Sequence, residues 1–155
     1  MALNDVLDFL EKHSFNAIRM PIAVSAVLEG SRPACMEDGG FYYNKNRPLQ
    51  KLDFPSLLRH VVLEAGRRGI LIMLDLHSMG PGLWPDDGVL GASEAEQLRN
   101  AWAVLAEYLC HTAFWNVFAA DLKNEPHGMC VAVPKRLACA SHKCTFHERY
   151  MTCWL

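Results

Sequence analysis

A carboxylate stands where the sequence predicts that a buried strand ends. The apolar run at residues 117 to 122 is followed by Asn124, Glu125 and Pro126. Proline has no N–H to give to a sheet ladder and pushes the preceding residue toward an extended conformation. We therefore expect Glu125 to be extended and to precede a turn. A carboxyl group held in this way can donate or accept a proton in catalysis.

Two further predicted strands carry polar side chains of types that occur in active sites. The first is expected to end at Arg19, before Met20 and Pro21, and the second at the run from Asp75 to Ser78, which includes His77. Residues two apart on a strand share a face, so Asp75 and His77 are expected to point the same way. Arg19 could pair with Asp75 or Asp121 simply to neutralise a buried charge, and such a role is compatible with one in an active site.

Three repeats of a helix followed by a strand can be read from the hydrophobic periodicity. The predicted helices span residues 3 to 10, 54 to 68 and 93 to 109, and the predicted strands lie within residues 15 to 22, 69 to 78 and 117 to 122. Strands that are buried on both faces and separated by helices indicate parallel pairing. In a (β/α) barrel the carboxyl ends of such strands converge on the face that holds the active site. The polar residues at these strand ends are therefore expected to meet.

Composition and charge exclude several classes of protein. Apolar residues make up 51% and charged residues 21% of the chain, as in ordinary folded domains. The net charge of -2 gives no reason to expect a nucleic acid partner. No apolar run is long enough to span a membrane, and we predict no signal peptide at the N-terminus. A globular enzyme remains allowed.

The three strand motifs resemble those of glycoside hydrolase family 5, which includes cellulases (endo-β-1,4-glucanases) and related β-glycanases. The similar segments are residues 15 to 21, 69 to 78 and 121 to 128. The resemblance covers roughly residues 1 to 128 and matches strands two to four of the family's barrel. It implies an α/β fold, namely an incomplete (β/α)8 TIM barrel of roughly three αβ units with an irregular C-terminal tail.

The resemblance also implies a role for each matching residue. Glu125 corresponds to the general acid/base, and Asn124 to its neighbour that hydrogen-bonds the substrate 2-hydroxyl. Arg19 corresponds to the arginine that supports the nucleophilic glutamate, and His77 to the histidine beside the scissile bond. The implied reaction is hydrolysis of the O-glycosyl bonds of a β-glucan such as cellulose with retention of configuration, which needs no cofactor. The implied partner is a polysaccharide or oligosaccharide, and the implied location is extracellular.

A retaining glycosidase needs two carboxyl groups about 5 Å apart, and the motifs supply one. The family's nucleophile lies on the seventh strand, so we expect it to be absent from this chain. Asp121 precedes Glu125 by four residues, roughly 13 Å along a strand, and is too far away to replace it. We therefore predict that this chain is truncated relative to the family and does not turn over substrate. A noncatalytic carbohydrate-binding remnant and a non-functional truncated product are the alternatives.

Two loops carry aromatic residues on which a sugar ring could rest. Tyr42 follows the first predicted strand and Trp84 follows the second. Packing within the loops is an equally open interpretation. His127, close to the acid, could contact substrate or serve only its loop. Trp102 and Trp115 are instead expected in the core.

Residues 129 to 155 differ in character from the predicted catalytic domain at residues 1 to 128. The tail holds Cys130, Cys139, Cys144 and Cys153, four of the six cysteines in the chain. A zinc site is disfavoured because close cysteine pairs are lacking, and a disulfide is open if the protein is secreted. We favour a third interpretation, an abnormal C-terminus such as a translated intron or a frameshift.

Overall fold

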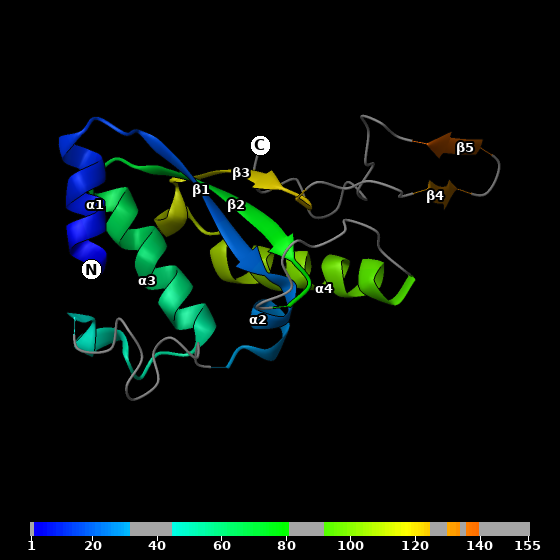
Figure 1. Cartoon of the computed structure of the whole chain (residues 1–155), viewed down its shortest axis with the longest axis horizontal. Coiled ribbons are helices and arrows are strands. Elements are labelled where there is room, and N and C mark those ends of the chain that lie inside the picture. The colour runs from blue at the N-terminus through cyan, green and yellow to red at the C-terminus, as the bar shows by residue number, and fades with distance from the viewer. Residues whose placement is uncertain (1, 32–44, 81–91, 125–129, 134–135, 140–155) are drawn as a thin grey trace.

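A sheet of three parallel strands forms the centre of the protein, seen in a computed structural model that describes residues 2–31, 45–80, 92–124, 130–133 and 136–139 (Figure 1). The strands are β1 (Ala17–Ala23), β2 (Leu71–Ser78) and β3 (Val117–Asp121), in that order across the sheet. The helices are α1 (Leu3–Lys12), α2 (Val24–Glu29), α3 (Phe54–Arg67) and α4 (Ala92–Leu109), with short 3-10 turns η3 (Arg47–Leu49) and η4 (Thr112–Phe114). The predicted alternation of helix and strand is confirmed.

The register of the sheet places Asp75 and Asp121 side by side and Arg19 two residues before their level. Arg19 on β1 lies opposite Met73 on β2, and Asp75 on β2 lies opposite Asp121 on β3. Because both pairings are parallel, the carboxyl ends of all three strands lie at the same edge of the sheet.

Helix α3 illustrates how the local sequence determines where an element begins and ends. The side chain of Asp53 accepts a hydrogen bond from the backbone N–H of Ser56 at 2.9 Å, and Pro55 occupies the first turn, where no partner for its nitrogen is needed. Past the end of the helix, Gly69 takes a φ of 69°, a left-handed conformation that suits glycine and turns the chain into β2.

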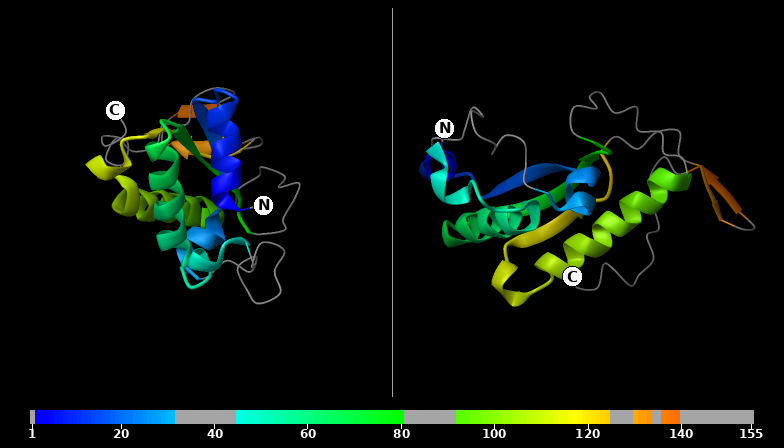
Figure 2. Two further views of the ribbon diagram at one scale, coloured as in Figure 1. Left: turned by 90° about the vertical axis from the view of Figure 1, so that its left-hand side faces the viewer. Right: turned by 90° about the horizontal axis from the view of Figure 1, so that it is seen from below.

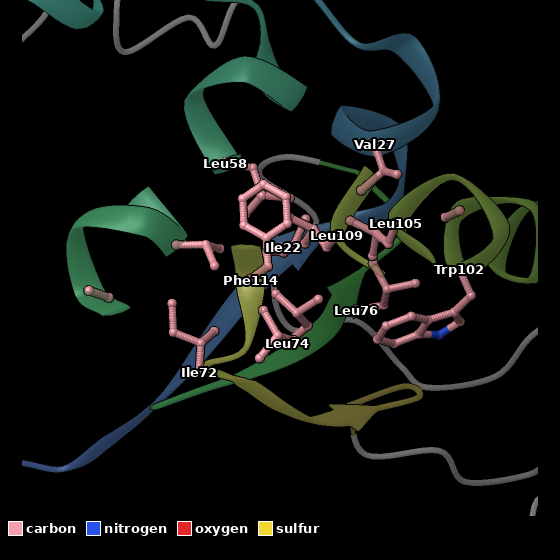
Figure 3. Packing of buried hydrophobic residues seen from close by; sticks show 14 of the residues in the cluster. Ile22, Val27, Leu58, Ile72, Leu74, Leu76, Trp102, Leu105, Leu109 and Phe114 are labelled. Atoms are coloured by element: carbon pink, nitrogen blue, oxygen red, sulfur yellow. The ribbon is translucent and has the colours of Figure 1, made fainter. Parts of the chain in front are cut away.

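The core lies between one face of the sheet and helices α3 and α4, which lie on the same side of the strands in the right-hand view of Figure 2. Ile72, Leu74 and Leu76 alternate along β2 and are fully buried in this layer (Figure 3). The helices supply Leu58, Val62, Ala65, Leu98, Ala101, Trp102, Leu105 and Leu109. The intervening residues Asp75 and His77 therefore point to the other face, as predicted from their spacing.

Two expectations about burial were wrong. Strand β1 was predicted to be buried on both faces, but most of its residues are half-exposed or exposed. The predicted end of this strand at Arg19 was also wrong, because β1 continues through Pro21 to Ala23. An edge strand tolerates this proline, and within the described residues β1 pairs with β2 alone. Trp115, expected in the core, is 61% exposed, because it lies at the end of η4 before β3 begins.

Sequence periodicity missed two elements. The first is α2, only six residues long, which follows β1 without a capping side chain. The second is an antiparallel pair in the tail, β4 (Cys130–Val133) and β5 (Arg136–Cys139), where an irregular segment was expected. Within the described residues, no helix has both the length and the apolar character needed to cross a membrane.

Candidate functional site

One guanidinium group joins the ends of the three strands. Arg19 Nη2 lies 2.8 Å from Asp121 Oδ2, 2.8 Å from Asn124 Oδ1 and 3.1 Å from Asp75 Oδ2. Arg19 Nε donates a further hydrogen bond to Asp121 Oδ2 at 3.1 Å. Both carboxylates predicted as possible partners of Arg19 are thus its partners. We call Arg19, Asp75, His77, Asp121 and Asn124 the strand-end cluster.

Asp75 is the buried centre of this cluster. Its side chain is 0% exposed, whereas those of Arg19 and His77 are 39% and 19% exposed. Its Oδ2 lies 2.7 Å from His77 Nδ1. Burial raises the pKa of the Asp75 carboxyl, although the hydrogen bond with His77 and the charge of Arg19 oppose that shift; the charge of Asp121 adds to it.

Asn124 reaches the cluster because β3 ends early. On a continuing strand, Asn124 would point away from the face of Asp121. The strand stops at Asp121, and the turned chain lets the Asn124 backbone N–H donate to Leu76 O at 3.3 Å. The side chain then meets Arg19. Sequence reasoning left this orientation open, since it depends on where the strand stops.

Lys123 is a residue of the site that the sequence did not single out. It is 4% exposed, and its Nζ donates hydrogen bonds to the carbonyl oxygens of His77 at 3.0 Å and Asn124 at 3.1 Å. These bonds tie the end of β2 to the segment after β3. In the sequence, Lys123 directly follows an apolar run and precedes Asn124, so it looked like an ordinary polar residue at the end of a strand.

The hydrogen bond from Arg19 fixes the orientation of the Asn124 amide. A guanidinium group carries donors and no acceptor, so the amide oxygen of Asn124 must face it. The amide nitrogen then lies on the other side of the group as a donor. A donor fixed in this way suits a ligand hydroxyl, because its orientation is already set before binding.

The structure brings together three of the predicted site residues, namely Arg19, His77 and Asn124. Glu125, His127, Trp84 and Tyr42 lie outside the described residues, as do the side chains of the four tail cysteines. In the described ranges, no three histidine, cysteine, aspartate or glutamate side chains are grouped as metal ligands. A cavity of about 250 Å³ beside α1, η3 and α3, lined by residues such as Asn46 and His60, shares no residue with the strand-end cluster.

Comparison with known proteins gives a consistent result. A family model described as "Cellulase (glycosyl hydrolase family 5)" matches residues 2–140. An endoglucanase of Paenibacillus polymyxa is 31% identical over 127 residues, which are 82% of this chain and 30% of the relative. The major extracellular endoglucanase of Xanthomonas campestris pv. campestris is 29% identical over 125 residues, 80% of this chain and 24% of the relative.

Solved structures agree with the sequence matches. A cellotetraose complex of an endocellulase from Pyrococcus horikoshii superposes with a TM-score of 0.67 at 32% identity, over 86% of this chain and 33% of that one. The catalytic domain of the Xanthomonas endoglucanase gives a TM-score of 0.59 at 30% identity, over 82% and 35%. The predicted partial (β/α)8 barrel is confirmed, and the chain spans about a third or less of the length of these relatives.

Proposed function

The chain belongs to the cellulase family, glycosyl hydrolase family 5, and from this membership we propose that it carries the proton-donor half of a retaining β-glucan hydrolase site. The general acid/base is Glu125, and the residues that bind the sugar next to the scissile bond are Asn124 and His77. Arg19 orients this group. Cello-oligosaccharide is the proposed ligand class, since the solved relative from Pyrococcus horikoshii is a cellotetraose complex.

The observation that carries the proposal is the contact of 2.8 Å between Arg19 Nη2 and Asn124 Oδ1. It joins Arg19, inside β1, to a residue 105 positions later that lies just past the carboxyl end of β3, the side on which barrel enzymes hold their active sites. It also sets the amide nitrogen of Asn124 as a donor, immediately before Glu125 in the chain. A sugar 2-hydroxyl is an acceptor for that donor.

In the proposed reaction, Glu125 gives its proton to the glycosidic oxygen as the bond from that oxygen to the anomeric carbon breaks. A second carboxylate forms a bond to the anomeric carbon from the opposite side. Water then attacks this carbon, Glu125 takes the proton of the water, and the bond to the second carboxylate breaks. Hydrogen bonds to the 2-hydroxyl that strengthen in the transition state assist both steps.

The described cluster offers no second carboxylate for this reaction. Asp121 and Asp75 are both held by Arg19, and Asp75 is fully buried. We therefore propose that the strand-end cluster binds the sugar but does not supply the nucleophile. The oligosaccharide would be met outside the cell, as the name of the Xanthomonas relative says of that protein. The disulfide at Cys110 supports such an oxidising location.

Binding is tested by titrating cellotetraose into the purified chain and following amide chemical shifts. We expect shifts at Asn124 and His77, and a loss of affinity of about tenfold in Asn124→Ala, equivalent to one hydrogen bond of about 1.4 kcal/mol. Asn100→Ala, an exposed change on α4, is the matched control and should bind as the wild type does. Equal binding by Asn124→Ala would disprove the assigned contact.

Turnover is tested separately with soluble β-glucan. The wild type and Glu125→Gln should both release no reducing sugar. Hydrolysis by the wild type that disappears in Glu125→Gln would establish Glu125 as the acid. It would also show that a second catalytic carboxylate is present in the chain. Hydrolysis that persists in Glu125→Gln would disprove the assignment of the acid.

A further inference from the structure

Lys123 is a buried cation to which the proposed reaction assigns no role. It is 4% exposed, and its Nζ donates hydrogen bonds to the carbonyl oxygens of His77 at 3.0 Å and Asn124 at 3.1 Å. Taking an ammonium group out of water is costly, and an apolar side chain of similar size often fills such a place without loss of stability. A lysine at this position therefore calls for an explanation other than packing.

The two acceptors of this ammonium group lie at the ends of two neighbouring strands. The carbonyl group of His77 belongs to the end of β2, and that of Asn124 lies just past the end of β3. Asn124 is the next residue in the chain, so the side chain of Lys123 folds back over the bend that follows it. The bond to His77 anchors this bend to the central strand of the sheet.

Asn124 is held at three of its polar groups. Its backbone N–H donates to Leu76 O at 3.3 Å, its Oδ1 accepts from Arg19 Nη2 at 2.8 Å, and its carbonyl oxygen accepts from Lys123 Nζ. The first two contacts hold the residue in place and orient its side chain, whereas the third sets the direction of its carbonyl group. Because a peptide unit is planar, that direction determines how the chain continues toward Glu125.

We propose that Lys123 is a positioning residue that fixes the backbone of Asn124, so that the amide of Asn124 meets the sugar while the chain enters Glu125 in a set direction. The inference rests on the proposed function for its ligand and for the role of Glu125. Lys123 acts through hydrogen bonds to the backbone. Hydrogen bonds from a charged donor are stronger than those between neutral groups, which suits a contact that must hold one torsion angle.

Trp102 provides a matched control on the same segment. Its side chain is as buried as that of Lys123, and its Nε1 donates to the carbonyl oxygen of Leu122 at 3.0 Å. Trp102→Phe therefore also removes a buried donor to a backbone carbonyl, two residues before Asn124. A loss of stability should follow from this change, whereas a reorientation of the Asn124 backbone should follow from changing Lys123 only.

The first test uses residual dipolar couplings of the full chain without sugar. The couplings of the peptide unit between Asn124 and Glu125 report its orientation. The wild type should fit a carbonyl group that faces Lys123 Nζ, and Trp102→Phe should keep this orientation. Lys123→Met, whose side chain has a similar length but no donor, should lose it.

The wild-type measurement decides the matter even if Lys123→Met does not fold. A wild-type carbonyl group of Asn124 that faces away from Lys123 would overturn the inference without any variant. An orientation that is unchanged in a folded Lys123→Met would overturn it as well.

Cellotetraose binding supplies the second test. The acid exerts its effect as the bond breaks, so affinity for the intact sugar reports mainly on Asn124. Lys123→Met should weaken binding about fivefold, less than the loss of about tenfold expected for Asn124→Ala, because two contacts of Asn124 remain. Trp102→Phe should bind within about twofold of the wild type. Equal losses in Lys123→Met and Trp102→Phe would overturn the positioning role.

A double variant shows whether Lys123 acts through Asn124. In the Asn124→Ala background no amide is left to position, so Lys123→Met should weaken binding further by less than about twofold. An undiminished loss of about fivefold in that background would show that Lys123 acts elsewhere, and would overturn the proposal. A wild type that binds no cellotetraose would overturn the proposed function, whereas the dipolar couplings, which need no sugar, still decide whether Lys123 fixes the backbone of Asn124.

Discussion

Asn116 fits so closely against Gly66 that a Cβ atom on Gly66 would lie 3.0 Å from both Cγ and Oδ1 of the asparagine. Asn116 is fully buried, and its Nδ2 donates to the carbonyl oxygens of Val62 at 2.9 Å and Ile70 at 3.1 Å. The side chain thus ties the last turn of α3 to the start of β2 and to the segment that leads into β3. Gly66 leaves the space that this tie requires.

A double-mutant cycle tests this fit. Gly66→Ala alone should destabilise the protein by about 1 kcal/mol, because overpacking of about 2 kcal/mol exceeds the helix propensity gain of about 1 kcal/mol. Asn116→Ala removes the clash, so Gly66→Ala in that background should stabilise by up to about 1 kcal/mol. Urea unfolding of the four proteins measures both values. The same sign in both backgrounds would contradict the packing argument.

Strong local patterns explain which parts of the fold could be predicted. Helix α3 and strand β2 were located from one apolar face and one apolar run, each bounded by a stop signal at Gly69. The exposure of Trp115 could not be read in the same way, since periodicity does not say which apolar residues face a neighbour. The burial of β1 failed for the same reason, because its place at the edge is a property of the whole sheet.

The contacts of the candidate site can likewise be separated into those that the sequence predicts and those that depend on the folded chain. The convergence of parallel strand ends predicts that Arg19, His77 and Asn124 meet, and the sequence allows Arg19 to pair with Asp75 or Asp121 to neutralise a buried charge. The contact between Arg19 and Asn124 depends on β3 ending at Asp121. The sequence did not predict this end, because the apolar residue Leu122 extends the apolar run by one residue. The role of Lys123 likewise depends on two carbonyl groups that only the folded chain brings within reach.

Trp102 is expected to stabilise the segment that precedes Asn124. It is 4% exposed, and its Nε1 donates to the carbonyl oxygen of Leu122 at 3.0 Å. Trp102→Phe should lower the free energy of unfolding by about 2 kcal/mol, from the lost hydrogen bond and the smaller ring. Trp115→Phe is the control, because that side chain is 61% exposed, and it should change stability by less than about 0.5 kcal/mol. Equal losses in the two variants would contradict the buried role of Trp102.

Asp75 should make a distinct contribution to the dependence of stability on pH. Its pKa is raised in the folded state by burial, so the folded protein holds this proton more tightly than the unfolded chain. The favourable contribution is therefore fully present below the unfolded pKa of about 3.8 and is lost as pH rises through the folded value. Other carboxyl groups titrate in the same range, and Asp53, whose pKa is lowered by its hydrogen bonds with Ser56, acts in the opposite direction.

The difference between the wild type and Asp75→Asn isolates this contribution. The variant keeps the size of the side chain but has no proton to exchange at that position. The stability of Asp75→Asn relative to the wild type should be greatest near neutral pH and should fall as the solution becomes acidic. Urea unfolding at a series of pH values measures it, and a difference that grows toward acid would show that the pKa of Asp75 is lowered instead.

The open edge of β3 is expected to promote self-association. Within the described part of the chain β3 pairs with β2 alone, and Phe118 on this strand is 46% exposed. Strand β1 at the other edge contains Pro21 and Arg19, which discourage pairing with another chain. Phe118→Lys should therefore reduce the concentration-dependent increase in sedimentation coefficient, since a charged residue protects an edge strand.

Phe9→Lys is the control, because Phe9 is 54% exposed but lies on α1, and it should leave association largely unchanged. An equal reduction by the two variants would mean that exposed apolar surface in general, rather than the β3 edge, drives association. A wild type that stays a soluble monomer at high concentration would disprove the prediction for the β3 edge.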